Sequence, residues 1–219
     1  MTTLSTYRPD VNRRELLWLA VFLNLQFVAV VLYYALSGVS VTEPRYALYG
    51  VVWITVGVLV IYKVRPPSGV DFETRRRAVA IAATYFGLLA VFGGLVGTGV
   101  DPEITGFRLA WLPPGWGPAF VYGGPYLTIV LMPAYLVGYL ALAYLVYTVV
   151  LDASGSAVAG VAGLLSCVSC TWPILSAVAA AVLGGSGVLA AAAMELSYDL
   201  STVVFLATVA LLYWRPGFR

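Results

Sequence analysis

The only two cysteines of the chain, Cys167 and Cys170, lie three residues apart. This spacing places both sulfur atoms on one face of a helix. Thiolate ligands favour soft ions such as Cu(I) over Mg²⁺ or Ca²⁺, whereas zinc usually takes four Cys or His ligands, and the chain has no histidine. The pair therefore predicts a site for Cu(I) or another soft metal ion. The alternative is that both cysteines are small packing residues.

Pro173 follows the cysteine pair by one helical turn. Proline has no backbone N–H to donate, and its ring clashes with the carbonyl four residues earlier, so we expect a helix kink that frees a carbonyl beside Cys170.

Glu195 and Asp199 lie four residues apart in the last apolar stretch, and hence on one helix face. An acidic side chain inside a membrane is costly and indicates a functional site. We expect no Lys or Arg at the same depth. The two acids therefore predict a site for proton or cation coupling, or for a charge supplied by a partner subunit. The alternative is two neutral acids hydrogen-bonded between helices.

Residues 167–187 resemble the cysteine-pair span of mercuric-ion transport membrane proteins. The resemblance lies in Cys167-Val-Ser-Cys-Thr-Trp-Pro173 and in the glycine-rich end at Leu183-Gly-Gly-Ser-Gly187. Those proteins have adjacent cysteines and fewer spans. The resemblance is therefore local and implies no activity for the chain as a whole.

The composition of the chain is that of a membrane protein. Of its 219 residues 61% are hydrophobic and 10% are charged, against about 25% charged residues in soluble domains. Six apolar stretches are long enough to cross a hydrocarbon core of about 30 Å. We therefore predict one all-α, multi-pass domain of the cell membrane, residues 1–219, that is a bundle of six transmembrane helices. The predicted spans lie near residues 16–36, 46–64, 78–100, 125–151, 157–183 and 188–214, and residues 101–124 form an outer aromatic loop.

Basic residues are distributed unevenly between the two sides of these spans. Nine of the twelve fall in the segments before the first span, between the second and third, and after the last, and a tenth, Lys63, lies at the end of the second span on the same side. Cytoplasmic loops carry such an excess of Lys and Arg. The pattern predicts a cytoplasmic N-terminus and a cytoplasmic C-terminus.

These features favour a membrane protein that binds or passes a soft metal ion such as Cu(I). One alternative is a non-catalytic accessory or scaffold subunit of a larger membrane complex, working with a partner membrane subunit or as a homo-oligomer. A second alternative is an intramembrane thiol-disulfide oxidoreductase that uses Cys167 and Cys170. The absence of histidine removes the usual haem ligand. A role other than an enzyme is favoured, with the lipid bilayer as the expected partner and no nucleic acid.

Overall fold

A computed structural model describes residues 13–40, 43–98, 105–152, 199, 201–210 and 212–213. The chain divides into two compact units, residues 1–40 and residues 41–219, and each is described by itself.

The first unit contains one helix, α1 (Arg13–Ser37). Between Leu16 and Leu36 its only strongly polar side chains are those of Asn24 and Gln26. Its 25 residues extend over about 37 Å at a rise of 1.5 Å per residue. By length and composition α1 can cross a membrane, as predicted for residues 16–36.

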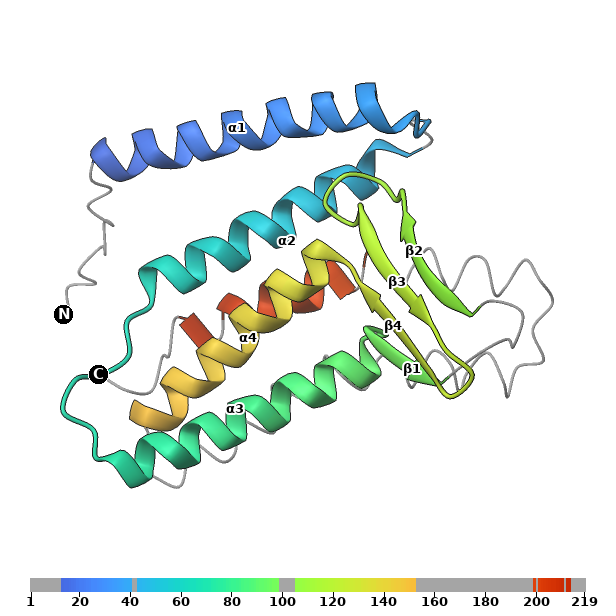
Figure 1. The fold of residues 1–219 in the computed structure, drawn as a ribbon. Coiled ribbons are helices and arrows are strands. Elements are labelled where there is room, and N and C mark those ends of the chain that lie inside the picture. The colour runs from blue at the N-terminus through green and yellow to red at the C-terminus, as the bar shows by residue number, and fades with distance from the viewer. Residues whose placement is uncertain are drawn as a thin grey trace. The chain divides into compact units, whose positions relative to one another are not determined.

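The second unit contains three long helices, α2 (Pro44–Lys63), α3 (Phe72–Phe92) and α4 (Pro133–Asp152). Helix α4 packs against both α2 and α3 and lies between them (Figure 1). The Tyr144 hydroxyl of α4 donates to the carbonyl of Val64 just after α2, at 2.8 Å, and Trp53 in the middle of α2 meets Tyr135 and Tyr139 earlier in α4, so α2 and α4 run in the same direction. The Tyr139 hydroxyl meets the carbonyl of Gly93 just after α3, at 3.5 Å, so α3 runs in the opposite direction. A further apolar helix, Ser201–Ala210, is here named the C-terminal helix.

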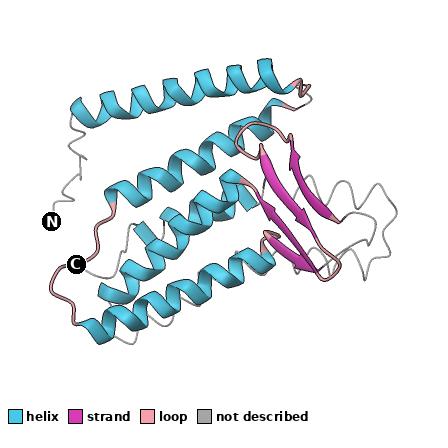
Figure 2. Ribbon diagram, viewed as in Figure 1, coloured by secondary structure: helices cyan, strands magenta, loops and turns pink. Residues whose placement is uncertain are grey.

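Four strands form one antiparallel sheet: β1 (Val96–Thr98), β2 (Gly106–Ala110), β3 (Ala119–Gly123) and β4 (Leu127–Leu131), in the order β1-β4-β3-β2. Figure 2 shows the strands gathered at one end of α2, α3 and α4. We name this the sheet end. The opposite end carries Lys63, Arg65 and the run Arg75, Arg76 and Arg77, and we name it the basic end.

The two faces of the sheet differ in burial. Ala119 is fully buried and Val121 is 8% exposed, whereas their neighbours on β3, Phe120 and Tyr122, are 48% and 46% exposed. Phe107 pairs with Tyr122 in the strand register and is also exposed. One face therefore packs into the unit, and the other presents an apolar, aromatic surface.

The prediction of an all-α bundle of six helices is wrong, because residues predicted as span ends and loop form this sheet. The predicted span 78–100 is α3, which begins earlier at Phe72, followed by strand β1. The predicted span 125–151 divides into strand β4 and helix α4. The predicted loop 101–124 contains β2 and β3. A short strand of apolar residues and the end of an apolar helix have the same composition, so span length alone does not separate them.

Membrane character is confirmed at a coarser level. Among the described residues, three helices are long and apolar enough to cross a membrane: α1 from Leu16 to Ser37, α2 and α4. Helix α3 is not among them, since its first two turns carry Arg75, Arg76 and Arg77. The C-terminal helix lies within the predicted span 188–214, whereas the predicted span 157–183 and both predicted cytoplasmic termini lie outside the described residues.

Candidate functional site

Asp199 lies beside the first two turns of α2, at the sheet end. The Tyr49 hydroxyl donates a hydrogen bond of 2.6 Å to Asp199 Oδ1. The Arg45 guanidinium lies 3.8 Å from Asp199 Oδ2 and 3.3 Å from Glu43 Oε2. Arg45 therefore lies between two carboxylates, that of Glu43 just before α2 and that of Asp199, and links the beginning of α2 to Asp199.

This ion pair is partly exposed to solvent, and its carboxylate also accepts the hydrogen bond from Tyr49. The side chains of Arg45 and Asp199 are 33% and 41% exposed. Ion pairs of that exposure contribute about 0 to 1 kcal/mol to stability. The short hydrogen bond from Tyr49 is the stronger contact, since an intramolecular hydrogen bond contributes about 0.5 to 1.5 kcal/mol to stability, and more when its acceptor is charged.

One helical turn after Tyr49, Trp53 of α2 contacts the C-terminal helix. Its indole N–H donates to the Thr202 hydroxyl at 3.1 Å. Its ring stacks on Phe205 with centroids 4.0 Å apart and planes within 8°. Trp53 is only 2% exposed, so its N–H needs a partner inside the protein, and Thr202 supplies it. Asp199, Thr202 and Phe205 thus lie on the side of the C-terminal helix that faces α2.

Trp53 also belongs to an aromatic cluster that connects the helices to the sheet. The Tyr135 and Tyr139 rings of α4 stack on each other at 5.3 Å, and both meet Trp53 edge to face. Trp116, from the segment between β2 and β3, packs against Trp53 and Tyr135. The Trp116 indole N–H donates to the carbonyl of Tyr46 at 2.8 Å, which ties this segment to α2.

Glycines allow these elements to approach closely. Gly115 has a φ of +88°, which L side chains rarely adopt, and its Cα lies against the backbone of Gly50 in α2. Gly138 of α4 lies directly under the ring of Trp53, where a Cβ atom would collide with it. Small residues at helix contacts are typical of packing inside membranes.

The structure places only one of the predicted site residues. Asp199 is described, whereas Cys167, Cys170, Pro173 and Glu195 lie outside the described residues. The expectation that no basic side chain reaches the depth of the acids is wrong for Asp199, because Arg45 pairs with it. Asp199 therefore does not need a partner subunit to supply its counter-charge.

The sequence holds a signal for the depth of Asp199, although not for its pairing with Arg45. Counting back about 20 residues, the length of one span, from Arg215 places the start of the last span near residue 195. Asp199 then falls within its first turns, at the level of Arg45 in the first turn of α2. Starting that span at residue 188 placed Asp199 too deep.

Within the described ranges, no group of three or more Cys, Asp or Glu side chains is close enough to hold a metal ion. Asp199, Tyr49 and Arg45 form a charge-compensated contact between helices rather than an open ligand set. What this arrangement does is to attach Asp199 and the C-terminal helix to α2.

Comparison with known proteins gives one match over the whole chain. No curated protein and no solved structure matches it. The profile of one family matches residues 1–219, and that family is described as a family of unknown function. The chain therefore belongs to the DUF7546 family.

Proposed function

We propose that the protein binds or passes a soft metal ion such as Cu(I) within the membrane, with Cys167 and Cys170 as its ligands. The observation that carries the proposal is the spacing of the only two cysteines in a histidine-free, apolar chain. Two thiolates on one helix face suit an ion with few ligands, and soft sulfur donors select Cu(I).

The positions of Asp152 and Asp199 support this proposal. Asp152 ends α4 on the side of the basic end, since Tyr147 of α4 accepts a hydrogen bond from Arg75 at 3.3 Å. Asp199 lies at the sheet end, beside Tyr49. The 20 residues of α2 separate these ends by about 30 Å, the thickness of a hydrocarbon core. In the sequence, both cysteines lie between Asp152 and Asp199, in the part of the chain that connects the two ends.

The role of Asp199 changes in this proposal. A carboxylate that already has Arg45 and Tyr49 as partners is not the isolated acid that proton coupling needs. We assign Asp199 to anchoring the C-terminal helix and leave Glu195 as the candidate for proton or cation coupling.

The second candidate is an accessory subunit of a membrane complex, and one observation favours it. The outer face of the sheet exposes large apolar side chains, among them Phe107, Phe120 and Tyr122. Exposed apolar surfaces of this kind often mark interaction sites. This candidate predicts a partner that remains bound during purification, and it predicts no uptake of metal.

Anaerobic titration of the purified full chain with Cu(I), in competition with a chromophoric chelator, tests the proposal. We expect one ion per chain, and we expect C167S/C170S to lose it while retaining its helix content. Met132→Leu is the matched control, since it removes another sulfur donor outside the proposed site. A wild-type chain that takes up no Cu(I), or a double variant that binds as tightly as wild type, would overturn it.

A further inference from the structure

The basic end of the second unit carries an open groove that none of the proposed metal chemistry uses. The groove has a volume of about 750 Å³ and lies between the end of α2 and the side of α4. Its walls are the apolar parts of Val58, Ile61, Tyr62 and Tyr144, and Val64, Arg65 and Pro66 complete its lining.

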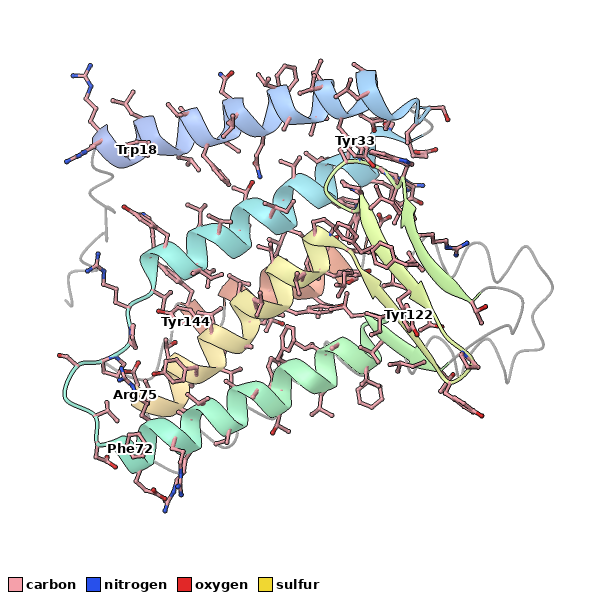
Figure 3. The ribbon with its side chains drawn as sticks, viewed as in Figure 1. Trp18, Tyr33, Phe72, Arg75, Tyr122 and Tyr144 are labelled. Carbon is pink, nitrogen blue, oxygen red and sulfur yellow. The ribbon has the colours of Figure 1, made fainter. Side chains whose placement is uncertain are left out.

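The floor of this groove is held by one hydrogen bond. The Tyr144 hydroxyl donates to the carbonyl of Val64, which lies just beyond the last turn of α2. Figure 3 labels Tyr144 on α4, and also Arg75 nearer the same end of the bundle. The bond holds the loop after α2 against α4, and both of its residues line the groove.

Arg65 supplies the charge of the groove. It is exposed, and it makes no hydrogen bond or ion pair in the part of the chain that the structure describes. The basic side chains of α3 differ, because Arg76 and Arg77 both pair with Glu73, at 3.2 and 3.3 Å. Arg75 donates its Nε to Tyr147 and is not part of the groove lining. Arg65 is therefore the guanidinium of the groove lining, and its donors are available for an anion.

The apolar walls belong to a helix that can cross a membrane. Val58, Ile61 and Tyr62 are 38%, 44% and 75% exposed and lie on the last two turns of α2. Arg65 follows two residues after α2 ends at Lys63, which is the level of the lipid head groups. The groove thus combines an apolar wall on α2 with a cation, Arg65, just beyond the end of that helix.

We propose that this groove binds one anionic phospholipid, with its phosphate at Arg65 and an acyl chain along Val58, Ile61 and Tyr62. A guanidinium pairs with phosphate through parallel N–H donors. A zwitterionic lipid would fit the walls equally well but would interact more weakly with the cation. The inference does not depend on the cysteines.

Native mass spectrometry of the full chain, extracted from equal mixtures of phosphatidylglycerol and phosphatidylcholine, tests this site. We expect the first retained lipid to be phosphatidylglycerol, and we expect Arg65→Gln to reduce its enrichment about fivefold, since one basic residue at the surface contributes about 1 kcal/mol. Arg65→Lys should keep most of the enrichment. Arg77→Gln is the matched control at the same end, because its partner is Glu73.

A second pair of variants tests the groove itself without changing charge. Ile61→Trp should fill it and remove the first lipid of either kind, whereas Ile81→Trp, at a position on α3 of similar exposure, should not. Circular dichroism and size-exclusion chromatography verify that each variant folds. The proposal is overturned if wild type retains both lipids equally, or if Arg65→Gln and Arg77→Gln reduce the enrichment of phosphatidylglycerol by the same factor. It is also overturned if Ile61→Trp retains the first lipid, since that lipid then binds outside the groove.

Discussion

Tyr49 and Asp199 lie 150 residues apart in the sequence, and the Tyr49 hydroxyl donates a 2.6 Å hydrogen bond to the Asp199 carboxylate. With Arg45, Tyr49 attaches the beginning of the C-terminal helix to the beginning of α2. An acid that looks isolated in the sequence is therefore a paired contact between two helices near one end of the bundle.

Tyr49→Phe should lower the free energy of unfolding by about 1 kcal/mol, because it removes the hydroxyl and leaves a carboxylate oxygen without that donor. Tyr126→Phe, at a position 89% exposed, should change it by less than about 0.5 kcal/mol. Denaturant unfolding in detergent, followed by tryptophan fluorescence, measures both. Equal effects of the two variants would show that the bond to Asp199 contributes nothing.

Gly138→Ala should destabilise the protein by about 1 to 3 kcal/mol, because its Cβ would collide with the Trp53 ring in a tightly packed contact. Gly87→Ala provides the control. Nothing lies within 4 Å of a Cβ there, so an alanine in the middle of α3 should stabilise the helix by about 0.5 to 1 kcal/mol. Thermal unfolding of both variants shows whether each substitution stabilises or destabilises the protein. Stabilisation by Gly138→Ala would show that α4 does not pack this closely against Trp53.

Asp71 caps the first turn of α3 and should make its stability depend on pH. The backbone N–H of Thr74 donates to the Asp71 carboxylate at 2.9 Å, and hydrogen bonds from the Thr74 backbone and side chain hold the pKa of Asp71 below its ordinary value. A pKa that is lower in the folded state gives stability that is fully present above the unfolded pKa. That stability is lost as the pH falls through the folded pKa.

Asp71→Asn separates this titration from capping, since Asn caps helices about as well but carries no charge. Hydrogen exchange at the first turn of α3 should show wild type more protected than the variant at neutral pH. At acidic pH, the protection of wild type should fall to that of the variant. A difference that does not change with pH would assign the effect to side-chain shape rather than to the charge.

The basic end should face the cytoplasm, because cytoplasmic segments carry the excess of Lys and Arg. In a C167S/C170S background, single cysteines at Ser68, between α2 and α3, and at Thr105, beside β2, should react with an impermeant maleimide from opposite sides of the membrane. Ser68 should be labelled only after the cytoplasmic face is opened. Labelling of both positions from one side would contradict this orientation.

Helix α2 was predicted well from the sequence, at residues 46–64 against Pro44–Lys63 in the structure. A nearly unbroken apolar run lies between Pro44 and the two basic residues Lys63 and Arg65, and these residues mark where the helix begins and ends. Helix α3 was predicted less well. The run from Arg75 to Arg77 was assigned to a loop, but the cap at Asp71 starts the helix earlier and holds these three residues in its first turns.

The sheet could not be predicted from hydropathy, since β4 and the beginning of α4 form one apolar run from Leu127 onward. Pro133 marks the division, because proline is favoured at the first position of a helix and unfavourable inside one. Alternation in β3, where Ala119 and Val121 are buried and Phe120 and Tyr122 are exposed, indicates a strand only once its two faces are known.

The pairing of Asp199 with Tyr49 and Arg45 needed contacts between distant parts of the chain. Local spacing predicts which residues share a helix face, as for Cys167 and Cys170 or Glu195 and Asp199. It does not predict which other helix that face meets. This limit explains why Asp199 was named as a site residue while its partners were missed.

X-ray absorption at the copper edge, recorded on the full chain loaded with one equivalent of Cu(I) under reducing conditions, tests the central claim most directly. A site made by Cys167 and Cys170 predicts sulfur as the dominant neighbour of the ion in wild type, a weaker sulfur signal in C167S and in C170S, and no retained copper in the double variant. Copper surrounded by oxygen or nitrogen in wild type, or a sulfur signal that both single variants leave unchanged, would contradict it.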